Sequence, residues 1–82
     1  RYNLALVLDA LGETGTAREQ LTYLLGRDPN YAPAHYLLGV ILSRDPAATI
    51  EAARALRRFL ELAPNDPHAE RVRQWLNQHR AR

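Results

Sequence analysis

The three histidines are the side chains of this 82-residue chain that first suggest chemistry, because imidazole binds metals and transfers protons near neutral pH. His68 and Glu70 are two residues apart, so on a helix their side chains point in different directions. Neither a CxxC nor an HExxH motif accompanies them, and the chain contains no cysteine. We therefore predict that His35, His68 and His79 are structural or exposed residues and that the chain binds no metal.

Catalytic groups of other kinds are equally scarce. Apart from histidine, every basic residue is arginine, eleven in all. A phosphate-binding P-loop and Schiff-base catalysis both require lysine, which the chain lacks. Ser43 stands in no nucleophile motif, and Asp66 occupies a position that suits a helix cap. The sequence therefore predicts neither an enzyme nor a cofactor-binding protein.

Arginine is concentrated in the C-terminal part of the chain. After residue 50, seven arginines are set against four acidic residues, which gives this segment a net charge of +3. Arg54, Arg57 and Arg58 would share one helix face and could attract phosphate. However, Glu51 and Glu61 lie within one turn of them and would pair with them, and no aromatic residue stands between the arginines. A solvated face is the better interpretation, and we predict no nucleic-acid partner.

The elements that would position these side chains follow from an internal repeat. Small and apolar residues recur at a spacing of 34 residues and then of 35, so that one residue is inserted near a predicted turn at Ser43 to Pro46. The matched pairs are Leu4 with Leu38, Ala5 with Gly39, Leu8 with Leu42, Ala17 with Ala52, Leu21 with Leu56, Leu24 with Phe59 and Pro29 with Pro64.

This pattern resembles the tetratricopeptide repeat, W-x2-L-G-x2-Y, then A-x3-F, then P. The second unit has His35-x2-Leu38-Gly39-x2-Leu42, Ala52-x3-Leu56 and Pro64, and the first has Arg1-x2-Leu4-Ala5-x2-Leu8, Ala17-x3-Leu21 and Pro29. The resemblance covers about residues 1–66, although His35 and Arg1 replace the usual aromatic residue. It implies an all-α, right-handed superhelix of antiparallel helix pairs with five helices in one domain. Repeat 1 spans about 1–30, repeat 2 about 31–65, and a capping helix about 66–80.

Four small residues are expected where the helices of each pair cross. Backbones approach closely only where side chains are small, so we expect Ala5, Ala17, Gly39 and Ala52 at the crossings. A glycine in the middle of a helix costs roughly 1 kcal/mol relative to alanine, so Gly39 requires a packing reason.

The predicted helix bounds come from caps and apolar periodicity. The helices are expected at Tyr2 to Leu11, Thr16 to about Arg27, about Ala32 to Ser43, Pro46 to about Leu62, and Pro67 to about Arg80. Gly12 should stop the first helix, Thr16 and Glu19 should form a capping box after a turn at residues 14–16, and Asp45 should cap the fourth helix. The fifth helix does not match the repeat, and its polar face suits a terminal cap.

The family resemblance also implies a binding groove. In such repeats the first helix of each pair lines a concave surface that binds an extended peptide or a helix. By position, the lining residues are Tyr2, Leu6, Asp9, Tyr36, Val40, Ser43, Arg44, Arg71, Trp75 and Gln78. Tyr2 and Leu6 stand where a clamp for a terminal carboxylate would need a basic residue and Asn. The resemblance therefore implies a protein-interaction scaffold for an apolar peptide or an amphipathic helix.

Two alternatives remain open at this point. The groove residues could cover a neighbouring repeat, because stacked repeats bury one another's faces. The chain could instead self-assemble through the groove and an open N-terminal face that includes Leu4, Leu8 and Leu11. The chain begins without Met inside a repeat, so we expect the C-terminal part of a longer protein, and its Arg-rich, Lys-free composition is typical of a bacterial genome rich in GC. No apolar run is long enough to span a membrane.

Overall fold

A computed structural model describes residues 1–79 of the chain. Within them the chain forms five α-helices and no β-strand, which confirms the predicted all-helical class. The helices are α1 (Tyr2–Ala10), α2 (Thr14–Arg27), α3 (Ala32–Ser43), α4 (Thr49–Leu62) and α5 (Ala69–Gln78), with a 3-10 turn at Pro46–Ala48. The predicted end of the last helix near Arg80 lies outside the described residues.

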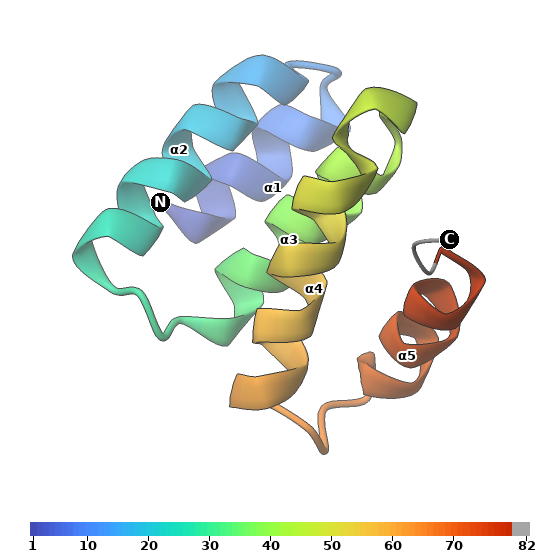
Figure 1. Cartoon of the computed structure of the whole chain (residues 1–82). Coiled ribbons are helices and arrows are strands. Elements are labelled where there is room, and N and C mark those ends of the chain that lie inside the picture. The colour runs from blue at the N-terminus through green and yellow to red at the C-terminus, as the bar shows by residue number, and fades with distance from the viewer. Residues whose placement is uncertain (80–82) are drawn as a thin grey trace.

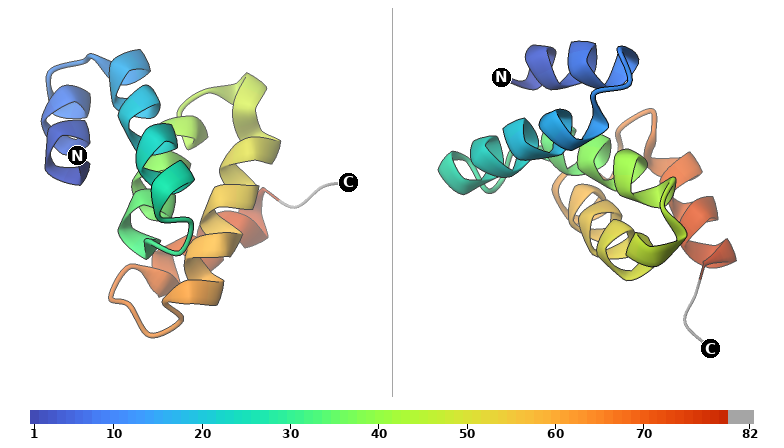
Figure 2. Two further views of the ribbon diagram at one scale, coloured as in Figure 1. Left: turned by 90° about the vertical axis from the view of Figure 1, so that its left-hand side faces the viewer. Right: turned by 90° about the horizontal axis from the view of Figure 1, so that it is seen from above.

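Each helix packs against the next one along the chain (Figure 1). α1 and α2 form a first hairpin, and α3 and α4 form a second one that contacts the first through α3. α5 packs on α4 and so extends the row of helices. Figure 2 shows α1 at one edge of the molecule, with the other helices all on one side of it.

The four small residues of the repeat lie inside the protein, as predicted. Ala5, Ala17 and Ala52 each have 0% exposure, and Gly39 is also buried. A Cβ atom added at Gly39 would lie 2.5 Å from Cδ2 and 2.6 Å from Cγ of Leu56, in the facing helix α4. The backbone of α3 therefore approaches α4 at the place where the repeat has its glycine.

The first loop confirms one prediction and corrects another. Gly12 follows α1 with a φ of +83°, a left-handed conformation that glycine adopts without strain, and Glu13 N–H donates to the Leu8 carbonyl at 2.8 Å. The predicted turn at residues 14–16 and the capping box of Thr16 and Glu19 were wrong. Ala17 N–H already donates to the Glu13 carbonyl at 3.0 Å, so the helix starts at Thr14 and no side chain caps it.

The last two helices begin later than the sequence predicted. Asp45 is a cap, since its side chain accepts from Ala47 N–H at 3.0 Å, but the residues that follow it form a 3-10 turn and α4 starts at Thr49. Asp66 accepts from His68 N–H at 2.8 Å, and α5 starts at Ala69 and not at Pro67. In both places proline follows the aspartate directly, and a tight turn precedes the regular helix.

The interior contains the apolar stripes that the sequence indicated. In α4 the apolar residues at helical spacing are buried or half-buried, namely Ala52, Ala55, Leu56, Phe59 and Leu60. Phe59 and Leu21 are the largest fully buried side chains among the described residues. Phe59 packs with Leu56 and Val72, so it joins α4 to α5. The second hairpin and α5 thus share one apolar cluster, which fixes the position of α5.

The Asp66 side chain, which accepts hydrogen bonds from His68 in the turn before α5, makes part of the stability dependent on pH. Hydrogen bonds from the His68 backbone and ring lower the pKa of Asp66. The folded state therefore gains stability above the unfolded pKa of about 4 and loses it as the pH falls through the lower folded pKa. We expect Asp66→Asn to lower the melting temperature at neutral pH, and we expect this difference from the wild type to shrink below about pH 4. A thermal melt series over pH measures it, and a difference that is constant with pH would contradict the assignment.

Candidate functional site

A partly open hollow between α3, α4 and α5 is the best-formed candidate site. It has a volume of about 220 Å³, and its walls are mostly apolar. The lining residues are Tyr36, Val40, Ser43, Leu56, Arg71, Val72 and Trp75. Of the ten predicted groove residues, the fold brings Tyr36, Val40, Ser43, Arg71 and Trp75 together in this hollow.

The aromatic side chains of the hollow are held in place by their neighbours. The Tyr36 ring lies 5.1 Å from the Phe59 ring and 4.6 Å from the His68 ring, measured between centroids. The Trp75 ring stacks on His79 at 4.1 Å and packs against the apolar clusters on both sides of it. Both rings are half-buried, so they are fixed by the core and still present surface to the hollow.

Two polar residues of the hollow, Ser43 and Arg71, differ in whether they already have a partner within the described chain. Ser43 Oγ donates to the Val40 carbonyl at 2.6 Å, a bond within α3 that uses its proton. Arg71 is exposed at the rim, and within residues 1–79 no carboxylate makes an ion pair with it. An incoming acidic group would therefore find an arginine that is not already paired with another part of the described chain.

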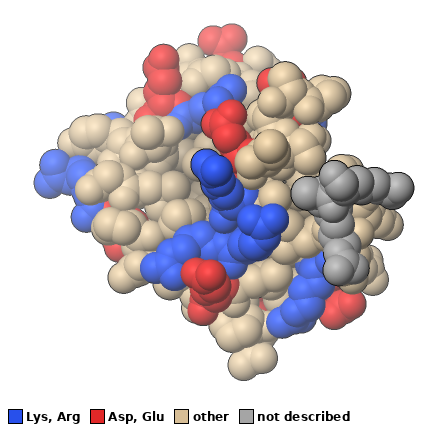
Figure 3. All heavy atoms as spheres, viewed as in Figure 1, with Lys and Arg blue, Asp and Glu red and all other residues tan. Residues whose placement is uncertain are grey.

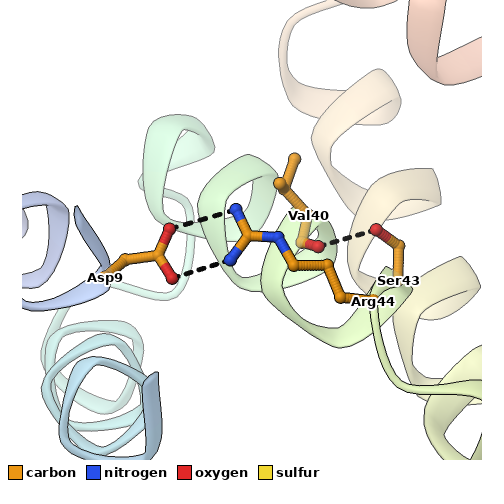
Figure 4. Close-up of polar contacts among 4 residues, drawn as sticks. All are labelled: Asp9, Val40, Ser43 and Arg44. Carbon is orange, nitrogen blue, oxygen red and sulfur yellow. Dashed lines mark hydrogen bonds and ion pairs between the residues drawn. The ribbon is translucent and has the colours of Figure 1, made fainter. Parts of the chain in front are cut away.

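Two further predicted residues, Asp9 and Arg44, bind each other. The Arg44 guanidinium donates to both carboxylate oxygens of Asp9, at 2.8 and 3.1 Å, and so links α1 to the end of α3 (Figure 4). These hydrogen bonds raise the pKa of Arg44. Because the Arg44 side chain is 55% exposed, solvent screens the pair and its contribution to stability is about 1 kcal/mol or less. Their first role is structural, because the pair links the two hairpins.

The remaining three predicted residues do not line the hollow. Tyr2 packs edge-on against Tyr31 at 5.8 Å and lines a different shallow depression, and burial raises the pKa of its hydroxyl. Leu6 is 41% exposed on α1, and Gln78 is exposed at the end of α5. The hollow therefore contains the predicted residues of α3 and two of the three predicted on α5, whereas those predicted on α1 lie apart from it.

Two residues of the hollow, Leu56 and Val72, were missed by the sequence analysis. Both are nearly buried, at 3% exposure each, and belong to the core stripes of α4 and α5. They form the floor because α5 packs on α4 and not on α3, so the hollow lies above the contact between α4 and α5. Nothing in the apolar pattern distinguishes such a floor residue from an ordinary core residue, so the sequence carried no signal for them.

The arginines of α4 share a solvated face, as predicted, but within residues 1–79 Glu61 makes an ion pair with one of them and Glu51 does not. Figure 3 shows basic side chains gathered on this side of the molecule with acidic side chains among them. Arg58 donates to Glu61 at 2.9 Å and to the Asn30 side chain at 2.8 Å. Both side chains of the Arg58–Glu61 salt bridge are exposed to solvent, so this face carries mixed charge.

Two other kinds of site are absent from the described part of the chain. Among residues 1–79, no three histidine, aspartate or glutamate side chains gather closely enough to hold a metal ion. No helix within the same residues combines the length and the apolar character needed to cross a bilayer.

The fold and the hollow together define a small all-helical protein built from two hairpins and a terminal helix. We compared the chain with protein-family models, curated proteins and solved structures, and none of these comparisons found a match.

Proposed function

We propose that this chain is a tetratricopeptide-like interaction scaffold, a right-handed superhelix of two repeats and a capping helix. Its role is to bind an apolar peptide or an amphipathic helix, without catalysis. The hollow between α3, α4 and α5 carries the proposal, because it gathers five of the residues that the family resemblance implied for the groove.

The size of the hollow supports a peptide over a small molecule. Small-molecule sites usually enclose about 300–1,000 Å³, whereas this hollow measures about 220 Å³ and is open on one side. It fits one or two apolar side chains of a longer ligand. In this mode an apolar anchor enters the hollow and the rest of the peptide or helix lies along the surface.

The rim adds a preference for acidic partners. Arg71 stands beside the apolar walls without a carboxylate partner in the described chain, and its guanidinium has the geometry to bind a carboxylate through two hydrogen bonds. A ligand with an apolar anchor and a nearby Asp or Glu would satisfy both the walls and the rim. Rim charges contribute more to association rate and specificity than to affinity, so Arg71→Gln should weaken binding less than a change in the walls.

Trp75 supplies a direct measurement, because it is the sole tryptophan of the chain and lies in the hollow. Peptides of about twelve residues are first selected for binding from a display library, since such a length spans the hollow and its rim. Titration of the wild type with a selected peptide should shift the Trp75 emission to shorter wavelength. A charge in an apolar wall should abolish this binding, so we expect Val40→Glu to reduce affinity by about a hundredfold or more.

Controls separate a lost site from a lost fold. Ile50 is 71% exposed and does not line the hollow, so Ile50→Glu should bind like the wild type. Circular dichroism must show that Val40→Glu and Tyr36→Ala remain helical. If both variants fold and bind the selected peptides as tightly as the wild type, the groove is not the binding site.

Self-assembly is a second candidate function, and one observation favours it. Among residues 1–79 six large hydrophobic side chains are exposed, and four of them belong to α1 and the residue that ends it. These four are Leu4, Leu6, Val7 and Leu11. Apolar side chains gathered on one helix are typical of an interface, whereas single ones are not. Light scattering tests this candidate, and a chain that stays monomeric at hundreds of micromolar would contradict it.

A further inference from the structure

We propose that the depression between α2 and α4 is a second docking site, which takes an aromatic side chain from an acidic segment of a partner protein. The residues of α3 that line it are His35, Leu38 and Leu42, which lie on a different side of the helix from the residues that line the hollow. This second site is independent of the function proposed above.

The depression exists because α3 is covered only in part. α2 and α4 both pack against α3 (Figure 1), but within residues 1–79 the backbones of α2 and α4 do not come close to each other. A strip of α3 therefore stays open between them, and the open volume is about 340 Å³. The apolar side chains that line it are Leu25 of α2, Leu38 and Leu42 of α3, and Ala55 of α4.

The two hairpins differ in the side chains that they place here. In the first hairpin Arg1 lies over the Tyr23 ring at 4.0 Å and donates to the Gln20 side chain at 2.8 Å, so these side chains fill the place together. The equivalent residues of the second hairpin all line the depression, and they are His35, Ala55 and Arg58. The repeat pattern also has an aromatic residue where His35 stands. An aromatic ring is therefore the kind of side chain that the second hairpin lacks.

The polar atoms of His35 and Arg58 already have partners. His35 Nε2 lies 2.8 Å from the Pro29 carbonyl oxygen. Arg58 donates to Glu61 at 2.9 Å and to the Asn30 side chain at 2.8 Å. An aromatic ring that packs on the leucines of the depression therefore leaves no polar group of these two side chains without a partner, and its burial carries little polar cost.

Charge selects an acidic partner. Arg54 lines the depression and is exposed, and within residues 1–79 no carboxylate makes an ion pair with it. Glu51 alone is acidic among the described lining residues. Because α3 and α4 are antiparallel, Arg58 lies toward the end with His35 and Glu51 toward the other end. An acidic group beside the aromatic anchor would therefore pair with Arg54 at the basic end, where a basic segment would be repelled.

Amide chemical shifts recorded with a synthetic probe peptide test this site. The probe has one tryptophan flanked by glutamates, and two matched peptides replace either the tryptophan by alanine or the glutamates by lysine. We expect the probe to give saturable shifts around His35, Leu38 and Ala55, and each matched peptide to bind about tenfold more weakly or worse. Equal binding of the alanine peptide would reduce the site to a surface ion contact and would overturn the proposal.

Variants of the protein separate this site from the hollow and from the fold. His35→Trp fills the depression from within, so it should abolish the shifts while circular dichroism shows an unchanged helix content. Arg54→Glu should weaken binding about tenfold or more. Arg57→Glu changes the net charge equally at an exposed residue outside the lining, so its affinity should stay within about threefold of the wild type. Val40→Glu, a change in the hollow, should bind the probe like the wild type.

Three further results would overturn the proposal. They are the absence of any saturable shift, shifts confined to the hollow around Val40 and Trp75, and unchanged binding in both His35→Trp and Arg54→Glu. The second of these would place the probe in the hollow and would support the function proposed above. Tighter binding of a thymidine oligonucleotide at the same amides would show that the site takes a nucleic acid and not a protein.

Discussion

Gly39→Leu should remove about 3 kcal/mol or more from the free energy of unfolding, which is much of the stability of a domain of this size. The reason is the contact between α3 and α4. A Cβ at residue 39 would already lie 2.5 Å from Leu56 Cδ2, and Leu56 is itself 3% exposed and surrounded by the core. A whole leucine side chain can be accommodated only if the two helices move apart. Chemical denaturation followed by circular dichroism measures the loss.

Smaller substitutions make the explanation specific. Gly39→Ala should gain roughly 1 kcal/mol in helix propensity but lose more through overpacking, for a net loss of about 1–2 kcal/mol. Gly26 is a helical glycine with nothing within 4 Å of its Cβ position, so Gly26→Ala should be neutral or stabilising. Combining Gly39→Ala with Leu56→Ala should cost less than the sum of the two single changes. If Gly39→Leu melts at the temperature of the wild type, the proposed crossing is wrong.

Phe59→Ala should destabilise the protein by about 3–5 kcal/mol, since a large buried side chain is lost and a cavity remains. Phe59 is 2% exposed and packs with Leu56 and Val72, so it joins α4 to α5. Its ring also supports Tyr36 at a centroid distance of 5.1 Å. The same substitution should therefore loosen one wall of the hollow. Denaturant unfolding measures the stability, and the emission of Trp75 reports the state of the hollow.

Two control substitutions, one conservative and one far from the core, show whether the stability loss in Phe59→Ala comes from the lost core volume. Phe59→Leu keeps most of the apolar volume and should cost clearly less than the alanine variant. Ile50→Ala changes a side chain that is 71% exposed and should stay within about 0.5 kcal/mol of the wild type. A loss below about 1 kcal/mol in Phe59→Ala would mean that α5 is held in place by other contacts.

The sequence predicted the helices well because the same small and large residues recur in both hairpins. The recurrence located Ala5, Ala17, Gly39 and Ala52 in the interior, where the structure has them. Helix starts were less predictable. The residue types of a capping box, such as Thr16 and Glu19, can also occur inside a helix that has already begun. Only the backbone bond from Ala17 to Glu13 shows that the helix has already begun there.

The candidate site was predictable only in part, for a related reason. Tyr36, Val40 and Ser43 share one side of α3, and helical spacing alone brings them together. The position of α5 depends on long-range packing around Phe59, and this packing decides that Val72 and Leu56 form a floor. Likewise, the pairing of Asp9 with Arg44 follows from the angle between two hairpins, which no local pattern encodes.

Amide chemical shifts recorded while a selected peptide is added test the central claim most directly. If the hollow binds an apolar anchor, the largest changes will fall on α3 and α5 around Val40, Arg71 and Trp75, and the indole N–H signal of Trp75 will move with them. If the peptide binds and the largest changes fall on the outer face of α1 or around Ile50, the hollow between α3, α4 and α5 is not the binding site.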